Sequence, residues 1–105
     1  MDATPNEQKT ETELQGCGAT GTRLTPEHID SVIKGVKYHQ FDSSTLIVCA
    51  IELENGFRVT GESACVSGGN FNASIGMRLA YEDARKKIWA LEGYLLRQKL
   101  HEAKG

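Results

Sequence analysis

The first apolar pattern along the chain predicts a short helix. In LTPEHIDSVIKGV the isoleucines and valines recur at helical spacing. Thr25 before them is a good N-cap, and Pro26 suits the first position of a helix. We therefore expect a helix over about 26–34 that ends near Gly35. The FDSS that follows is typical of a turn.

The second pattern predicts a β-hairpin. TLIVCAIELE (45–54) is β-branched and apolar, and FRVTGESAC (57–65) has the same character. Between them, Asn55-Gly56 is a strong signal for a two-residue turn. The two stretches are thus expected to pair as antiparallel strands.

A two-residue turn also predicts the register of this hairpin, with Ile51 opposite Thr60. Cys49 and Cys65 would then lie on opposite faces, which argues against a disulfide between them. Both faces would be largely apolar, so a second surface is expected to cover one of them. One face would carry Leu46, Val48, Ala50, Phe57, Val59, Gly61 and Cys65, and the other Ile47, Cys49, Ile51, Leu53 and Ala64.

The third pattern predicts one long helix over about 73–102. Gly93 in its middle favours a kink or a close helix–helix approach. Two apolar stripes on one helix indicate more than one partner surface. The first stripe is Met77, Ala80, Ala84, Ile88, Leu91 and Leu95, and the second is Leu79, Trp89, Leu96 and Leu100.

Together these patterns predict an α+β fold, in which a small antiparallel sheet and two helices are completed by oligomerisation. Residues 1–22 are polar and are expected to form a flexible arm, followed by a single α+β domain over 23–105. The arm contains GCGATG (16–21), which matches the dinucleotide pattern GxGxxG. No strand precedes it, so it is interpreted as a linker.

The composition of the chain argues against some classes of function and favours others. The 105 residues carry 12 basic and 14 acidic side chains, a balance far from that of a typical DNA-binding domain. From Gly76 onward, however, seven basic residues stand against four acidic ones, which suits an anionic ligand. Three cysteines without CxxC or zinc spacing favour a reducing cytoplasm, and no metal or cofactor is expected. No apolar run approaches the roughly 18 residues of a membrane span.

The stretch GESACVSGGNFN (61–72) has two chemical interpretations. GESAC resembles a nucleophile elbow but lacks its final glycine, and Ser63 lies inside a predicted strand, so catalysis is not expected. The loop after it can turn several backbone N–H groups toward an anion, and Asn72 is a plausible N-cap where a long helix begins. Arg58, Arg78, Arg85 and Lys86 could supply charge, and Phe57, Phe71 and Tyr81 could stack on a base. Equally, Gly68-Gly69 could permit a turn and nothing more.

The chain resembles a family of small tailed-phage proteins that includes the type-one Thoeris anti-defence sponges. The resemblance runs from about Leu24 to Leu100. Its most specific pieces are NGF (55–57), TGESAC (60–65), NF (70–71), ARKKIW (84–89) and LEGYL (91–95).

This resemblance implies a non-enzymatic protein that sequesters cyclic ADP-ribose isomers, and in some members cyclic di- or trinucleotides, in the cytoplasm of the infected bacterium. It implies a homo-oligomer, a dimer or higher and in particular a hexamer, with pockets at subunit contacts. Candidate ligand residues are then Arg58, Arg85 and Lys86 for phosphate, Phe57, Phe71 or Tyr38 for stacking, and Thr60, Ser63, Asn70 and Asn72 for hydrogen bonds. Two alternatives stay open: a small nucleic-acid-binding phage protein, and a structural or host-protein-binding oligomer.

Overall fold

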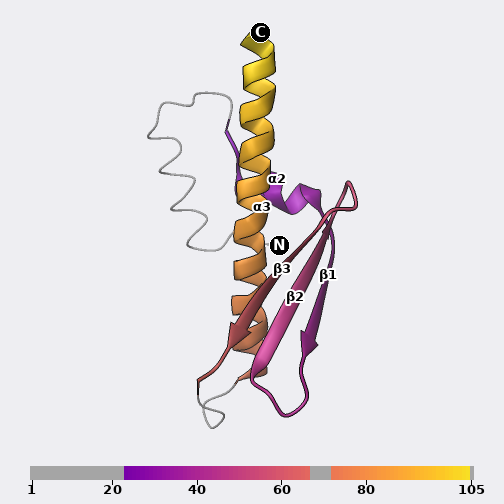
Figure 1. The fold of residues 1–105 in the computed structure, drawn as a ribbon, viewed down its shortest axis with the longest axis vertical. Helices are drawn as coiled ribbons and strands as arrows, with labels where there is room; N and C mark the ends of the chain where they lie inside the picture. Colours follow the sequence, from indigo (N-terminus) through magenta and orange to yellow (C-terminus); the bar gives the residue numbers. More distant parts are fainter. Residues whose placement is uncertain (1–22, 67–71, 105) are drawn as a thin grey trace. The chain divides into compact units, whose positions relative to one another are not determined.

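The computed structural model describes residues 23–66 and 72–104 and shows an α+β fold (Figure 1). The predicted arm, residues 1–22, lies outside the described residues. Two compact units divide the chain: Ile33–Ile88, and the remainder on either side of it. A single domain over 23–105 stays a prediction. In chain order the elements are α2 (Pro26–Val32), β1 (Ile33–Gln40), β2 (Leu46–Leu53), β3 (Arg58–Ala64) and α3 (Ala73–Lys104).

The sheet has one strand more than the predicted hairpin. Its order is β1-β2-β3, with both pairs antiparallel. The sequence pattern predicted a helix through residue 34, but α2 ends at Val32 and the chain continues directly as β1. A helix of seven residues gains little from intrinsic propensity, whereas the β-branched and aromatic residues that follow pack well on a pleated surface. Gly35 therefore lies at an irregularity of the β1–β2 ladder and not at a helix end.

The hairpin between β2 and β3 has a three-residue loop, so the predicted register is wrong by one residue. The Leu53 N–H donates to the Phe57 carbonyl at 2.8 Å, and the Gly56 N–H donates to the Leu53 carbonyl at 2.9 Å. Gly56 has φ of 90°, the left-handed conformation of a glycine bulge that follows a turn. Ile51 consequently pairs with Val59 and not with Thr60.

This slip moves every β3 side chain to the face opposite the predicted one. One face of the sheet now gathers the buried residues Ile47, Cys49, Ile51, Leu53, Val59 and Gly61. The other face carries the half-buried Leu46, Val48 and Ala50 between more polar neighbours on β1 and β3, namely Lys37, His39, Thr60 and Glu62. The apolar side chains of the hairpin are thus concentrated on one face more strongly than predicted.

Within the unit Ile33–Ile88, the first half of α3 packs closely on the buried face of the sheet. Ala80, Ala84 and Ile88 are completely buried, which confirms the core of the first predicted stripe. A Cβ atom added to Gly61 would lie 2.8 Å from the Ala84 Cα and closer still to the Ala84 nitrogen and the Ala80 carbonyl oxygen. The absence of a side chain at Gly61 therefore allows the helix backbone to approach β3.

Side chains of α3 also cover the free edge of β3. Asp83 accepts a hydrogen bond from the Glu62 N–H at 3.0 Å, and the Lys87 ammonium donates to the Thr60 carbonyl. These contacts satisfy backbone groups that would otherwise be open to pairing with another strand.

The second unit joins α2 to the last turns of α3. The Thr25 hydroxyl accepts the His28 N–H at 3.1 Å, which confirms Thr25 as the N-cap of α2. The long helix continues through Gly93, where an added Cβ atom would make an ordinary contact of 3.9 Å with Leu24 Cδ1. The close approach that Gly93 suggested thus occurs elsewhere, at Gly61.

Cys49 and Cys65 form no disulfide with each other, but the predicted reason is wrong: in the observed register the partner of Cys49 is Gly61, which lies four residues before Cys65. Burial raises the pKa of the Cys49 thiol to about 11, while its hydrogen bond with Tyr38 acts in the opposite direction. Partial burial, with Cys49 and Tyr81 nearby, also raises the pKa of Tyr38. Both groups are therefore neutral near pH 7.

We expect iodoacetamide at pH 8 to modify Cys65 well before Cys49. A thiol with a pKa of about 11 is about one part in a thousand thiolate at pH 8, and the thiolate is the reactive species. Cys49 also has no exposed surface, whereas Cys65 is partly exposed. Peptide mapping by mass spectrometry measures each rate separately, and the difference should disappear in denaturant. Equal rates in the folded protein would contradict the placement of Cys49.

Candidate functional site

A hollow of about 170 Å³ lies where β3 ends and α3 begins. Its walls come from the residue before β2, the end of β3 and the first two turns of α3. The lining residues are Thr45, Ser63, Ala64, Cys65, Asn72, Ile75, Gly76 and Leu79. No charged side chain is among them, so the hollow is a mainly apolar recess with hydroxyl, thiol and amide groups in its wall.

Hydrogen bonds from short side chains hold this recess together. The Ser63 hydroxyl donates to the Gly76 carbonyl at 2.6 Å, and the Thr45 hydroxyl donates to the Cys65 carbonyl at 2.7 Å. An added Cβ atom at Gly76 would lie 2.8 Å from Ile47 Cδ1, so a small residue is needed there as well. Ser63 thus fixes the end of β3 against α3, and its proton is directed to a carbonyl oxygen.

Asn72 is the N-cap of α3, as predicted. Its Oδ1 atom accepts the Ser74 N–H at 3.0 Å, the Ile75 N–H at 3.3 Å and the Ser74 hydroxyl at 2.9 Å. These are N–H groups at the positive end of a helix of 32 residues. An anion entering the recess would compete with the Asn72 side chain for them.

Of the predicted ligand residues, Ser63 and Asn72 line the recess, and Asn70 and Phe71 lie outside the described residues. Five others are exposed elsewhere on the unit. Arg58 forms an ion pair with Glu52 at 3.4 Å, and Arg78 forms one with Glu82 at 3.2 Å. Phe57, Thr60 and Lys86 are exposed and do not line the recess.

Arg85, the cation favoured from the sequence, has no exposed surface. Its Nη1 atom donates to the Tyr81 hydroxyl at 2.8 Å, and its guanidinium carbon lies 5.8 Å from the centre of the Tyr81 ring. Tyr38 pairs with Cys49 across the sheet and is 39% exposed. A ligand cannot reach Arg85 in this arrangement without opening the packing between helix and sheet.

Several residues of the recess were missed, although the sequence held a signal for them. Asn72, Ile75, Gly76 and Leu79 follow the spacing i, i+3, i+4, i+7, which places them on one face of α3. The apolar stripes predicted for this helix begin at Met77 and Leu79, so they leave out the residues that join this face to the end of the hairpin.

Among the described residues, 23–66 and 72–104, no group of three His, Cys, Asp or Glu side chains is placed to hold a metal ion. None of the helices in these ranges combines the length and the apolar character that crossing a membrane requires.

Comparison with known proteins gives one match. No curated protein and no solved structure matches the chain. A family model, described as the phage protein (N4 Gp49/phage Sf6 gene 66) family, matches residues 24–100. This range contains α2 and the three strands completely, and α3 up to residue 100. The chain therefore belongs to the N4 Gp49/phage Sf6 gene 66 family of phage proteins.

Proposed function

We propose that this phage protein is a non-enzymatic sponge, which binds a small phosphate-bearing signalling nucleotide of the bacterial host and holds it intact. Cyclic ADP-ribose isomers are the first candidates, and cyclic di- and trinucleotides the next. The observation that carries the proposal is the recess at the start of α3, where the helix N-terminus meets a wall free of carboxylates.

We further propose that one chain supplies only part of the pocket, and the size of the recess supports this. At about 170 Å³ it is smaller than the roughly 300–1,000 Å³ typical of sites for drug-sized ligands. Ile75 and Leu79 at its wall are 48% and 44% exposed, and Val66 nearby is fully exposed. Exposed apolar side chains around a recess are typical of a contact surface. A second copy of the chain would enlarge and close the pocket here, as part of a dimer or a higher oligomer acting in the host cytoplasm.

The role of Asn72 gives a sharp test, because two substitutions separate capping from ligand binding. Aspartate and serine both cap helices well, so Asn72→Asp and Asn72→Ser should keep the fold. Only Asn72→Asp adds a negative charge in the recess, which repels phosphate. We expect the protein to bind a cyclic ADP-ribose isomer or a cyclic dinucleotide with Kd below about 10 μM, and Asn72→Asp to weaken binding about tenfold or more. The Kd of Asn72→Ser should stay within a few-fold of the wild-type value.

Isothermal titration measures these affinities, and mass spectrometry of the ligand released by heat shows whether it is unchanged. Recovery of a hydrolysed ligand would make the protein an enzyme and overturn the proposal. So would the absence of any binding below about 10 μM, or equal binding by the two Asn72 variants.

One alternative is favoured by the same exposed side chains, namely contact with a host protein through Ile75 and Leu79. Leu79→Asp should then abolish capture of a defined host protein, while Leu100→Asp, at another exposed leucine of α3, should not. Nucleic-acid binding is less well supported, because Arg58 and Arg78 are both paired with glutamates. Support for this function would require that the protein retards a nucleic acid in a gel, and that this binding weakens steeply as the salt concentration rises.

A further inference from the structure

We infer that the unit formed by α2 and the end of α3 holds a separate binding site, for a small organic anion with an apolar body such as a medium-chain carboxylate. The site is a hollow of about 240 Å³. It is lined by Arg23, Leu24, His28, Glu92, Leu95, Leu96 and Lys99.

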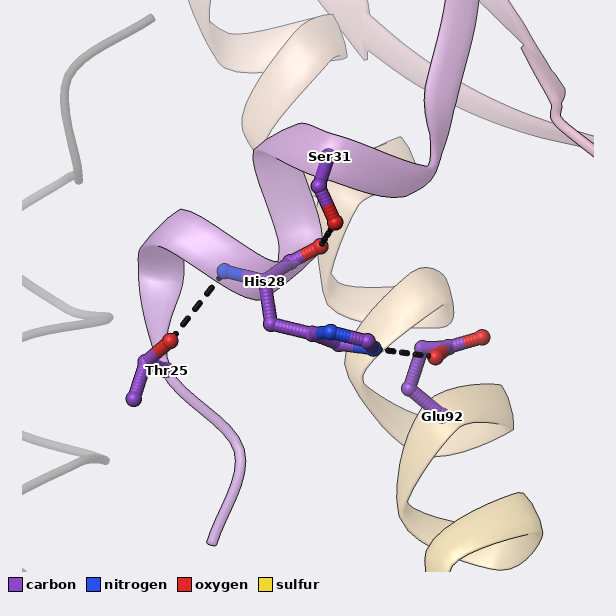
Figure 2. A network of polar contacts seen from close by, with 4 residues as sticks. All are labelled: Thr25, His28, Ser31 and Glu92. Carbon is purple, nitrogen blue, oxygen red and sulfur yellow. Dashed lines mark hydrogen bonds and ion pairs between the residues drawn. The ribbon is translucent and has the colours of Figure 1, made fainter.

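Helix geometry produces this hollow. Glu92, Leu95, Leu96 and Lys99 are spaced i, i+3, i+4, i+7, so they share one face of α3. The opposite wall comes from the residues that lead into α2 and from its first turn. Figure 2 shows the two walls joined where the His28 ring reaches from α2 to Glu92 on α3, with Nε2 and Oε1 2.7 Å apart.

The capping interactions of α2 hold His28 in place. Its backbone N–H is bound by the Thr25 hydroxyl, and its carbonyl accepts a hydrogen bond from the Ser31 hydroxyl at 2.6 Å (Figure 2). The Glu92 side chain is only 14% exposed. The two side chains therefore form a fixed part of the wall. Glu92, the one carboxylate in the lining, is already bound by His28.

The remaining lining has two chemical halves. Leu24, Leu95 and Leu96 offer an apolar surface, whereas Lys99 adds an exposed cation. Arg23 also lines the hollow, but it already has an interaction partner of its own. With Glu92 held by His28, this lining attracts an anion more than a cation. The volume, below the roughly 300 Å³ at which sites for drug-sized ligands begin, suits a small ligand. A ligand whose alkyl chain packs on the leucines and whose carboxylate binds the Lys99 ammonium satisfies both halves.

This inference does not rest on the proposed nucleotide function, since the two recesses belong to different units and share no residue. The test is a titration of the full chain with octanoate, in which ¹⁵N–¹H NMR spectra are recorded at each ligand concentration. We expect amide shifts at Leu24, Glu92 and Leu96, and much smaller ones with octanamide, the neutral analogue. Octanoate binding should be unaffected by a nucleotide bound elsewhere.

Lys99→Met tests the cation while keeping an unbranched side chain, and Arg97→Met is the matched control, an exposed cation on the same turns of α3 outside the lining. Loss of one charge-assisted contact should raise the Kd for octanoate about tenfold in Lys99→Met and not in Arg97→Met. The inference is overturned by an absence of shifts at about 1 mM octanoate, by an equal response to octanamide, or by equal effects of the two substitutions.

Discussion

Substituting Gly61 by alanine is expected to lower the free energy of unfolding by about 3 kcal/mol or more. The added Cβ atom would meet the backbone of α3 at Ala80 and Ala84, at distances that real Cβ atoms do not adopt. Backbone atoms of a helix cannot rotate away as a side chain can, so the helix would have to lift from β3. Since small domains are stable by about 5–15 kcal/mol, this is a large share of the total.

Chemical denaturation of Gly61→Ala beside Gly35→Ala measures the effect. Gly35 is exposed, and an added Cβ atom there finds no other atom within 4 Å, so this control should change stability by less than about 0.5 kcal/mol. Ala84→Gly combined with Gly61→Ala should give no rescue, because the clash is with backbone atoms. Wild-type stability in Gly61→Ala would show that α3 does not pack on β3 as described.

Replacement of Arg85 by alanine is the second large effect, with an expected loss of about 3–5 kcal/mol. The substitution empties the volume of a long, completely buried side chain and removes the donor to the Tyr81 hydroxyl. Arg85→Met keeps most of the volume without the charge, so it should cost clearly less than alanine. Arg97→Ala, at an exposed arginine of the same helix, should be nearly neutral.

These variants also separate a structural role of Arg85 from ligand binding. If Arg85 acts in the core, nucleotide affinity should fall only in variants that are themselves unfolded under the conditions of the titration. If the Arg85→Met variant folded with wild-type stability and yet no longer bound nucleotide, this would contradict the structural role of Arg85. It would show that the packing around Tyr81 opens to admit ligand.

Part of the candidate site could be predicted from the sequence, where its determinants are local. Asn72 lies directly before a long apolar periodicity, and a cap depends only on the residues of the first turn. Ser63 was predicted to contact ligand and does line the recess, but its hydrogen bond to Gly76 joins residues 13 positions apart. That pairing depends on how β3 meets α3, which no local pattern encodes.

The main error of the sequence-based prediction concerned which charged side chain of α3 is buried. Arg78, Arg85 and Lys86 lie within nine residues of one helix and look alike as cations. Because a helix turns by about 100° per residue, only one of them faces the sheet, where Tyr81 one turn earlier receives it. The face that α3 presents to the sheet is fixed by the small residues Gly61, Ala80 and Ala84, so it becomes visible only with the packing.

Local sequence patterns were sufficient to predict the α+β class, the two helix caps, the existence of the β2–β3 hairpin and the extent of α3, since all of these follow from periodicity and turn chemistry over a few residues. Tertiary structure decided that residues after Val32 form β1, that a bulge at Gly56 shifts β3 by one residue, and that Arg85 is buried. Each of these outcomes depends on contacts between segments distant in the chain. A strand gains its stability from its neighbours, and a one-residue shift is selected by which face can be buried against α3.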